Sequence, residues 1–139
     1  MSNHCPGCGY DHGLGIGRSW NILLPYAAQS LNQVGTNHRN NHAYRRARRS
    51  WAYRLQRCNV LDVPPAEGQR RIFFIRQWGK GKRAYDYGNL VGGFKPLLDM
   101  IVDCDLLIDD KPKYCLDYYS QMKSPSGADQ VIITLQEVL

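Results

Sequence analysis

The sequence predicts a single domain of the α/β (α+β) class, in which one mixed β-sheet carries two main helices. The chain has 139 residues, 43% of them hydrophobic, which suits one compact core. Strand-like and helix-like patterns alternate along it, and turn-forming residues separate them. The expected element order is β-α-β-α-β-β in residues 19–139, preceded by a separate tail at residues 1–18.

The first part of this domain predicts a strand followed by a helix. The apolar run SWNILLPY, residues 19–26, is expected as a strand that stops at Pro25. From His42 to Arg57 there is neither Gly nor Pro. Apolar residues recur there every four positions, at Ala43, Ala47, Trp51 and Leu55. This spacing predicts a helix with an apolar stripe.

The second part predicts more strand and a second helix. Residues 70–87 begin as a β-rich run and break at Gly79 and Gly81. A second helix is expected to begin near Phe94 or to bend there, because Pro96 suits only a first helical turn. Its apolar face would consist of Leu97, Leu98, Ile101 and Val102.

The C-terminal part predicts two further strands. YCLDYYSQM, residues 114–122, and QVIITLQEV, residues 130–138, both have strand-like composition. The turn-rich segment KSPSGAD separates them. We therefore expect these two strands to pair as a hairpin.

Charge is unevenly distributed along the chain, whose net charge is +6 at pH 7. No acidic residue occurs between Asp11 and Asp62, and seven arginines fall within residues 38–57. Such clustering is typical of proteins that bind the phosphate backbone of nucleic acids, although a solvated helix face is the alternative. The candidate DNA-binding residues are Arg39, Arg45, Arg46, Arg48, Arg49 and Lys111.

The centre of the chain is acidic instead. Six carboxylates and one cation, Lys95, lie between Asp86 and Asp110. If Asp86 ends a strand, its side chain and that of position 88 share a face, and Asp109 with Asp110 would complete a cage for Mg²⁺ or Mn²⁺. Such ions promote phosphodiester hydrolysis. The alternatives are an acidic surface of caps and turns, and a simple i,i+4 pair of Lys95 with Asp99.

The N-terminal tail contains a short cysteine and histidine cluster. Cys5 and Cys8 form a CxxC pair, with His4 and His12 close by. This spacing suits one half of a zinc site, and the alternative is a polar tail without metal. The five cysteines are odd in number and sparse, which favours reduced thiols. With no apolar run long enough for a membrane span, we expect a cytoplasmic protein without a membrane partner.

Three motifs together resemble the RusA family of Holliday-junction resolvases, the crossover junction endodeoxyribonucleases common in phages and prophages. They are D-x-G-N-L at residues 86–90, K-x-x-x-D at residues 95–99 and D-D at residues 109–110. The segment ILLPYAAQSLNQ is similar to the first strand and following loop of that family. The resemblance extends from about Trp20 to Val138.

The resemblance implies a homodimeric, Mg²⁺- or Mn²⁺-dependent endonuclease that cuts four-way DNA junctions by paired phosphodiester hydrolysis. Asp86 and Asp110, with Asp109 beside it, match metal-binding positions. Lys95 matches a lysine needed for cleavage, and Asn89 matches the Asn of the motif. The implied setting is recombination and repair of DNA in a bacterial or phage-infected cell.

Two departures from the family pattern bear on activity. Gly88 stands where the motif has a second Asp, and three extra residues, within VGGF, precede Lys95. Either the protein is a catalytically impaired junction-binding member, or another acid (Asp99, Asp103 or Asp109) replaces the missing ligand. A third hypothesis is a zinc-tailed interaction protein whose acidic centre is only a surface.

Overall fold

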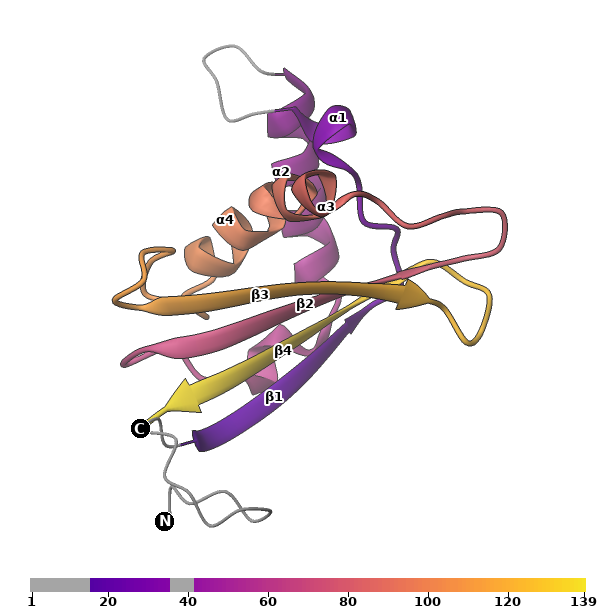
Figure 1. The fold of residues 1–139 in the computed structure, drawn as a ribbon. Helices are drawn as coiled ribbons and strands as arrows, with labels where there is room; N and C mark the ends of the chain where they lie inside the picture. Colours follow the sequence, from indigo (N-terminus) through magenta and orange to yellow (C-terminus); the bar gives the residue numbers. More distant parts are fainter. Residues whose placement is uncertain (1–15, 36–41) are drawn as a thin grey trace.

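The computed structural model describes residues 16–35 and 42–139, which form a four-stranded sheet with helices on one face (Figure 1). The strands are β1 (Ile16–Leu24), β2 (Arg70–Trp78), β3 (Cys115–Lys123) and β4 (Gln130–Val138). The helices are α1 (Leu31–Val34), α2 (His42–Gln56), the 3₁₀ helix η1 (Asn59–Asp62), α3 (Tyr87–Gly93) and α4 (Lys95–Asp103).

The strand order is β1-β4-β2-β3, with β2 and β3 parallel and the other neighbours antiparallel. This confirms the predicted single mixed sheet of an α+β domain. The predicted hairpin is wrong, because β4 pairs with β1 and β2 and not with β3. Hydrophobicity accounts for the difference: β4 buries Val131, Ile133 and Leu135 in the centre, whereas the more polar β3 takes the edge.

Alternate residues of the strands face the helices and form the core. Ile22 of β1, Phe74 of β2 and Ile133 of β4 are all at most 2% exposed, and they pack in one cluster with Trp51 of α2 and Leu97 of α4. Tyr118 and Tyr119 alternate between the two faces of the sheet on β3: the Tyr119 ring stacks on the core, while Tyr118 is exposed.

Both main helices lie where the sequence predicts them. In α2 the buried positions are Tyr44, Ala47, Trp51 and Leu55, so the apolar stripe is confirmed, with Tyr44 in place of Ala43. Helix α4 follows Phe94 and holds Pro96 in its first turn. That position is tolerated because the first-turn backbone N–H groups have no partner within the helix.

The VGGF segment forms the end of α3 and packs closely on the chain before α1. A Cβ atom on Gly93 would lie 1.9 Å from the backbone oxygen of Gln29, and one on Gly92 would lie 2.8 Å from the side chain of Leu31. Only glycine allows this approach at position 93. The extra residues therefore fix α3 against the loop that follows β1.

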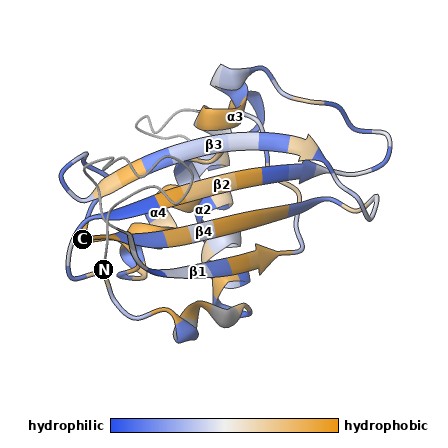
Figure 2. Ribbon diagram, turned by 60° about the horizontal axis from the view of Figure 1, so that its bottom comes forward, coloured by the Kyte–Doolittle hydropathy of each residue, from blue (hydrophilic) through white to orange (hydrophobic). Residues whose placement is uncertain are grey.

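The opposite face of the sheet carries no helix of the described residues (Figure 2). Paired residues on neighbouring strands form rows across it. One row consists of Leu23, Ile132, Ile75 and Ser120, and the next of Asn21, Thr134, Phe73 and Tyr118. Phe73 and Tyr118 stack with ring centroids 4.9 Å apart. This uncovered sheet face thus mixes polar and apolar side chains, and most of its apolar side chains lie in these two rows.

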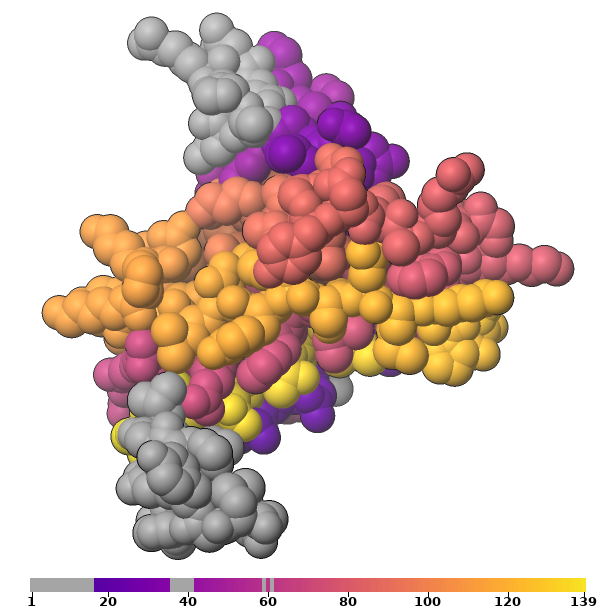
Figure 3. Space-filling model, viewed as in Figure 1, coloured from indigo at the N-terminus to yellow at the C-terminus, as the bar shows by residue number. Residues whose placement is uncertain are grey.

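Long connections extend at both ends of the sheet (Figure 3). The α4–β3 connection, in orange, is at one end, and the β2–α3 loop with the β3–β4 turn is at the other. Within residues 16–35 and 42–139, no helix has the length and apolar character needed to cross a membrane.

Candidate functional site

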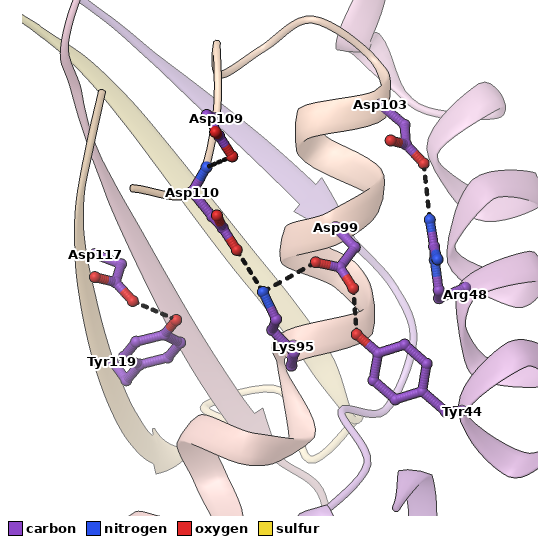
Figure 4. A network of polar contacts seen from close by, with 9 residues as sticks. All are labelled: Tyr44, Arg48, Lys95, Asp99, Asp103, Asp109, Asp110, Asp117 and Tyr119. Atoms are coloured by element: carbon purple, nitrogen blue, oxygen red, sulfur yellow. Dashed lines mark hydrogen bonds and ion pairs between the residues drawn. The ribbon is translucent and has the colours of Figure 1, made fainter. Parts of the chain in front are cut away.

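Lys95, the first residue of α4, lies between two carboxylates (Figure 4). Its Nζ is 3.1 Å from Oδ1 of Asp99 and 2.5 Å from Oδ2 of Asp110. The hydroxyl of Tyr44 on α2 donates to the other oxygen of Asp99. We call these four residues the Lys95 cluster.

Local folding explains how the Lys95 cluster forms. Lys95 and Asp99 are one helical turn apart, so the i,i+4 pair considered from the sequence is present. After α4, Asp105 adopts a left-handed conformation with φ 64°, and buried Leu106 and Leu107 anchor the returning chain. Asp110 then reaches the start of α4, and its backbone N–H donates to Oδ1 of Asp109 at 2.7 Å.

The ionisation of the cluster follows from these contacts. The hydrogen bond from Lys95 lowers the pKa of Asp110 below its ordinary value. Burial lowers the pKa of Lys95, but the bonds to Asp110 and Asp99 outweigh burial, so its pKa is raised overall. Burial and the bond to Asp99 raise the pKa of Tyr44. At neutral pH the centre is therefore an ammonium paired with the carboxylate of Asp110.

The placement of Asp86 at the end of a strand is wrong, and the alternative of caps and turns applies instead. Asp86 caps the N-terminus of α3. Its Oδ1 accepts from the backbone N–H of Asn89 at 2.9 Å, and its Oδ2 accepts from Asn89 Nδ2 at 2.7 Å. The Asp and Asn of the motif are thus paired as a helix cap.

Gly88 lies on the exposed first turn of α3, so positions 86 and 88 do not share a strand face as predicted. The nearest atom to a Cβ built there is Oδ1 of Asp86, at 3.6 Å, which is an ordinary contact. An aspartate therefore fits at position 88, directly beside Asp86.

The candidate metal ligands are only partly brought together. Asp109 and Asp110 are adjacent, but Lys95 already binds Asp110, and Asp86 caps α3. In the part of the chain that the structure describes, no three His, Cys, Asp or Glu side chains form a group able to hold a metal ion. Carboxylate oxygens suit Mg²⁺ or Mn²⁺, yet this arrangement does not form a complete site for either ion.

The candidate DNA-binding residues fall into different environments. Arg48 pairs with Asp103 at 3.0 Å, and Lys111 is highly exposed, 3.8 Å from Asp109. Arg45, Arg46 and Arg49 are exposed on α2 and form no ion pair with a described residue. Arg39 and the zinc candidates His4, Cys5, Cys8 and His12 lie outside the described residues.

Sequence reasoning missed the pairing of α2 with α4. Tyr44 and Arg48 are four residues apart on α2, and they contact Asp99 and Asp103, which are four apart on α4. Two polar residues four positions apart on each of two helices are the sequence signal that would have revealed this helix pairing.

A further polar contact lies on the edge strand β3, where the Tyr119 hydroxyl donates to Asp117 at 2.7 Å (Figure 4).

The chain matches no protein-family model and none of the curated proteins with which it was compared.

Proposed function

We propose that this protein binds branched DNA, such as a four-way junction, and hydrolyses phosphodiester bonds in it. The observation that carries the proposal is the placement of the motif residues Lys95 and Asp110 beside helix α2, whose exposed arginines form no ion pair with a described carboxylate. The resemblance of the three motifs to junction resolvases supports the same function.

Binding of the phosphate backbone is assigned to α2. Arg45, Arg46 and Arg49 are exposed and make no ion pair with a described carboxylate, so their charge is available to phosphates. Each neutralised phosphate releases counterions, which makes the affinity strongly dependent on salt.

The chemistry assigned to the chain's own residues is phosphate recognition by Lys95. Its ammonium can exchange one carboxylate partner for a phosphate oxygen, because the side chain is 39% exposed. Mg²⁺ or Mn²⁺ remains the cofactor expected from the resemblance. Since the described arrangement does not complete a site for it, hydrolysis requires Asp86, Asp109 or Asp110 to change partners.

A second candidate function is binding of branched DNA without hydrolysis. Gly88 favours this candidate, since the position that carries an acid in the family motif has no side chain. The occupation of Asp110 by Lys95 favours it too, because an ammonium in that place neutralises a carboxylate that a metal ion would need.

A homodimer formed through the uncovered sheet face is part of the proposal. Leu23, Tyr118 and Met122 on this face are 54%, 44% and 45% exposed. Contiguous apolar surface of this kind marks interaction sites. Four strands of nine residues give a face of about 30 by 15 Å, or roughly 450 Å² before side-chain relief. A standard stable interface buries about 800 Å² per partner, so side-chain relief and neighbouring elements would have to supply the remainder.

A second copy is the proposed partner because a two-fold dimer places this same face on both subunits. Two subunits also match a four-way junction, which has two strands to cut. The cytoplasm of a bacterial or phage-infected cell is the compartment that the resemblance suggests.

The experiment that tests hydrolysis is cleavage of a labelled synthetic four-way junction with Mg²⁺ or Mn²⁺. Asp110→Asn is expected to abolish cleavage, whereas the matched control Asp105→Asn is expected to retain it, because Asn tolerates the left-handed conformation at 105. If the Gly88→Asp variant cuts the junction and the unaltered protein does not, the result selects binding without hydrolysis as the function. If neither the unaltered protein nor Gly88→Asp cuts or binds the junction, both candidate functions fail, and stoichiometric bound zinc would then favour the zinc-tailed interaction protein.

A further inference from the structure

A cavity of about 500 Å³ opens beside α2, away from the Lys95 cluster. The chain after β1 rises from the sheet toward α1 and forms one wall of this cavity (Figure 1). The β2–α3 loop contributes Lys82 and Tyr85, and α2 contributes a third wall. No residue of the Lys95 cluster lines it.

Helical spacing explains the α2 wall. Arg46, Ser50 and Arg54 recur every four residues and so present one face of α2 to the cavity, next to the face that buries Trp51. Small side chains leave the space open. The alanines that line it are Ala27, Ala28, Ala43 and Ala47.

The cavity is positively charged. Arg46, Arg54 and Lys82 line it, and none of the described lining residues is acidic. Arg46 and Arg54 form no ion pair with a described carboxylate, and Lys82 is 3.9 Å from Asp129 with more than half of its side chain exposed. An anion in the cavity would therefore meet cations from both α2 and the β2–α3 loop.

Two aromatic rings are held in fixed positions at the cavity. The guanidinium of Arg54 lies 4.6 Å from the centroid of the Tyr26 ring. The Tyr85 hydroxyl donates to the backbone oxygen of Ala28 at 3.0 Å. The guanidinium of Arg76 covers one face of the Tyr85 ring, 3.4 Å from the ring centroid. Planar groups fixed in this way favour stacking with another planar group.

We propose that this cavity binds one unpaired nucleotide of branched DNA, with its base against the Tyr26 ring and its phosphate between Arg46 and Lys82. The volume lies within the range of small-ligand sites. Aromatic stacking combined with cations on the backbone is the general mode of single-strand recognition. The inference rests on the proposed function, because it names the part of the DNA that this second site contacts.

The test compares two double variants of the full chain. Arg46→Gln with Lys82→Gln removes one charge from each of two cavity walls. The matched control, Arg57→Gln with Lys80→Gln, removes two exposed charges at nearby residues that do not line the cavity. The probes are a short single-stranded oligonucleotide with a central 2-aminopurine, a linear duplex of the same sequence and a four-way junction, each measured by anisotropy.

The cavity variant is expected to lose about tenfold in affinity for the single strand relative to the duplex, while the control weakens both probes equally. Tyr26→Leu is expected to abolish the quenching of 2-aminopurine fluorescence seen with the unaltered protein. Equal losses for both double variants, or no quenching at all, would overturn the cavity assignment. If the cavity assignment is overturned but the unaltered protein binds the junction, the proposed function stands. If the unaltered protein binds none of the three DNA probes, both the cavity assignment and the proposed function are refuted.

Discussion

Replacing Lys95 with Met removes the ammonium at the centre of the candidate site while keeping most of the side-chain volume. That ammonium contacts Asp99 at 3.1 Å and Asp110 at 2.5 Å. The Lys95 and Asp110 side chains are 39% and 35% exposed, so solvent screens the pair, and an exposed pair contributes about 0.2 to 1 kcal/mol. Since Asp99 is only 17% exposed, we expect the free energy of unfolding to fall by about 1 kcal/mol at neutral pH.

The effect of this substitution should depend on pH. Lys95 lowers the pKa of Asp110 from the ordinary 3.8. A carboxylate whose pKa is lower in the folded state stabilises the fold above its unfolded value, and this contribution disappears as the pH falls through the folded value. The difference between the two proteins should therefore be full at neutral pH and shrink in acid, below the ordinary value of 3.8.

At the alkaline end the sign is the opposite. The raised pKa of Lys95 stabilises the fold below the ordinary 10.5, and this contribution is lost as the pH rises through the folded value.

Urea unfolding at neutral pH and at about pH 3, followed by circular dichroism, measures this difference. Lys111→Met is the control, since Lys111 is 75% exposed and 3.8 Å from Asp109, and its loss should cost less than about 0.5 kcal/mol. The reasoning is refuted if Lys95→Met costs no more than the control, or if its cost is the same at both pH values.

Three further substitutions, one of them with a matched control, test the fold and the dimer. Gly93→Ala places a Cβ atom 1.9 Å from the backbone oxygen of Gln29, so it should lower the free energy of unfolding by about 2 kcal/mol or more in thermal or urea unfolding. The control Gly88→Ala has its nearest contact at 3.6 Å and should not destabilise the protein. Similar costs at both positions would contradict the close packing of α3. Asp86→Ala removes the α3 cap and should cost about 1 kcal/mol, and an unchanged unfolding midpoint would show that the cap is unimportant. Tyr118→Glu puts a charge on the uncovered sheet face and should convert a dimer to a monomer in sedimentation velocity; an unchanged dimer would place the interface elsewhere.

The parts of the fold that depend on local patterns could be predicted from the sequence. Helix α2 follows from an uninterrupted four-residue apolar spacing, and the start of α4 follows from Pro96. The partner of β4 could not be predicted, because the turn-rich segment 123–129 fits a hairpin between β3 and β4 as well as it fits the observed connection between strands that are not neighbours. The choice is made by the competition of β3 and β4 for the central position, which is a property of the whole sheet.

The candidate site shows the same division. The pair of Lys95 and Asp99 is local, and helical spacing identifies it. The arrival of Asp110 depends on the left-handed turn at Asp105, for which the sequence carries no glycine signal. For Asp86, strand and cap were both compatible with the motif, and the hydrogen bonds to Asn89 decide between them.

The most direct test of the central claim is a competition between a four-way DNA junction and a linear duplex of the same sequence, measured at physiological salt without divalent metal. We predict that the junction is bound about tenfold more tightly, because the exposed arginines of α2 would contact backbones of more than one arm. Equal affinity for the two DNAs, or no binding to either, would contradict the account.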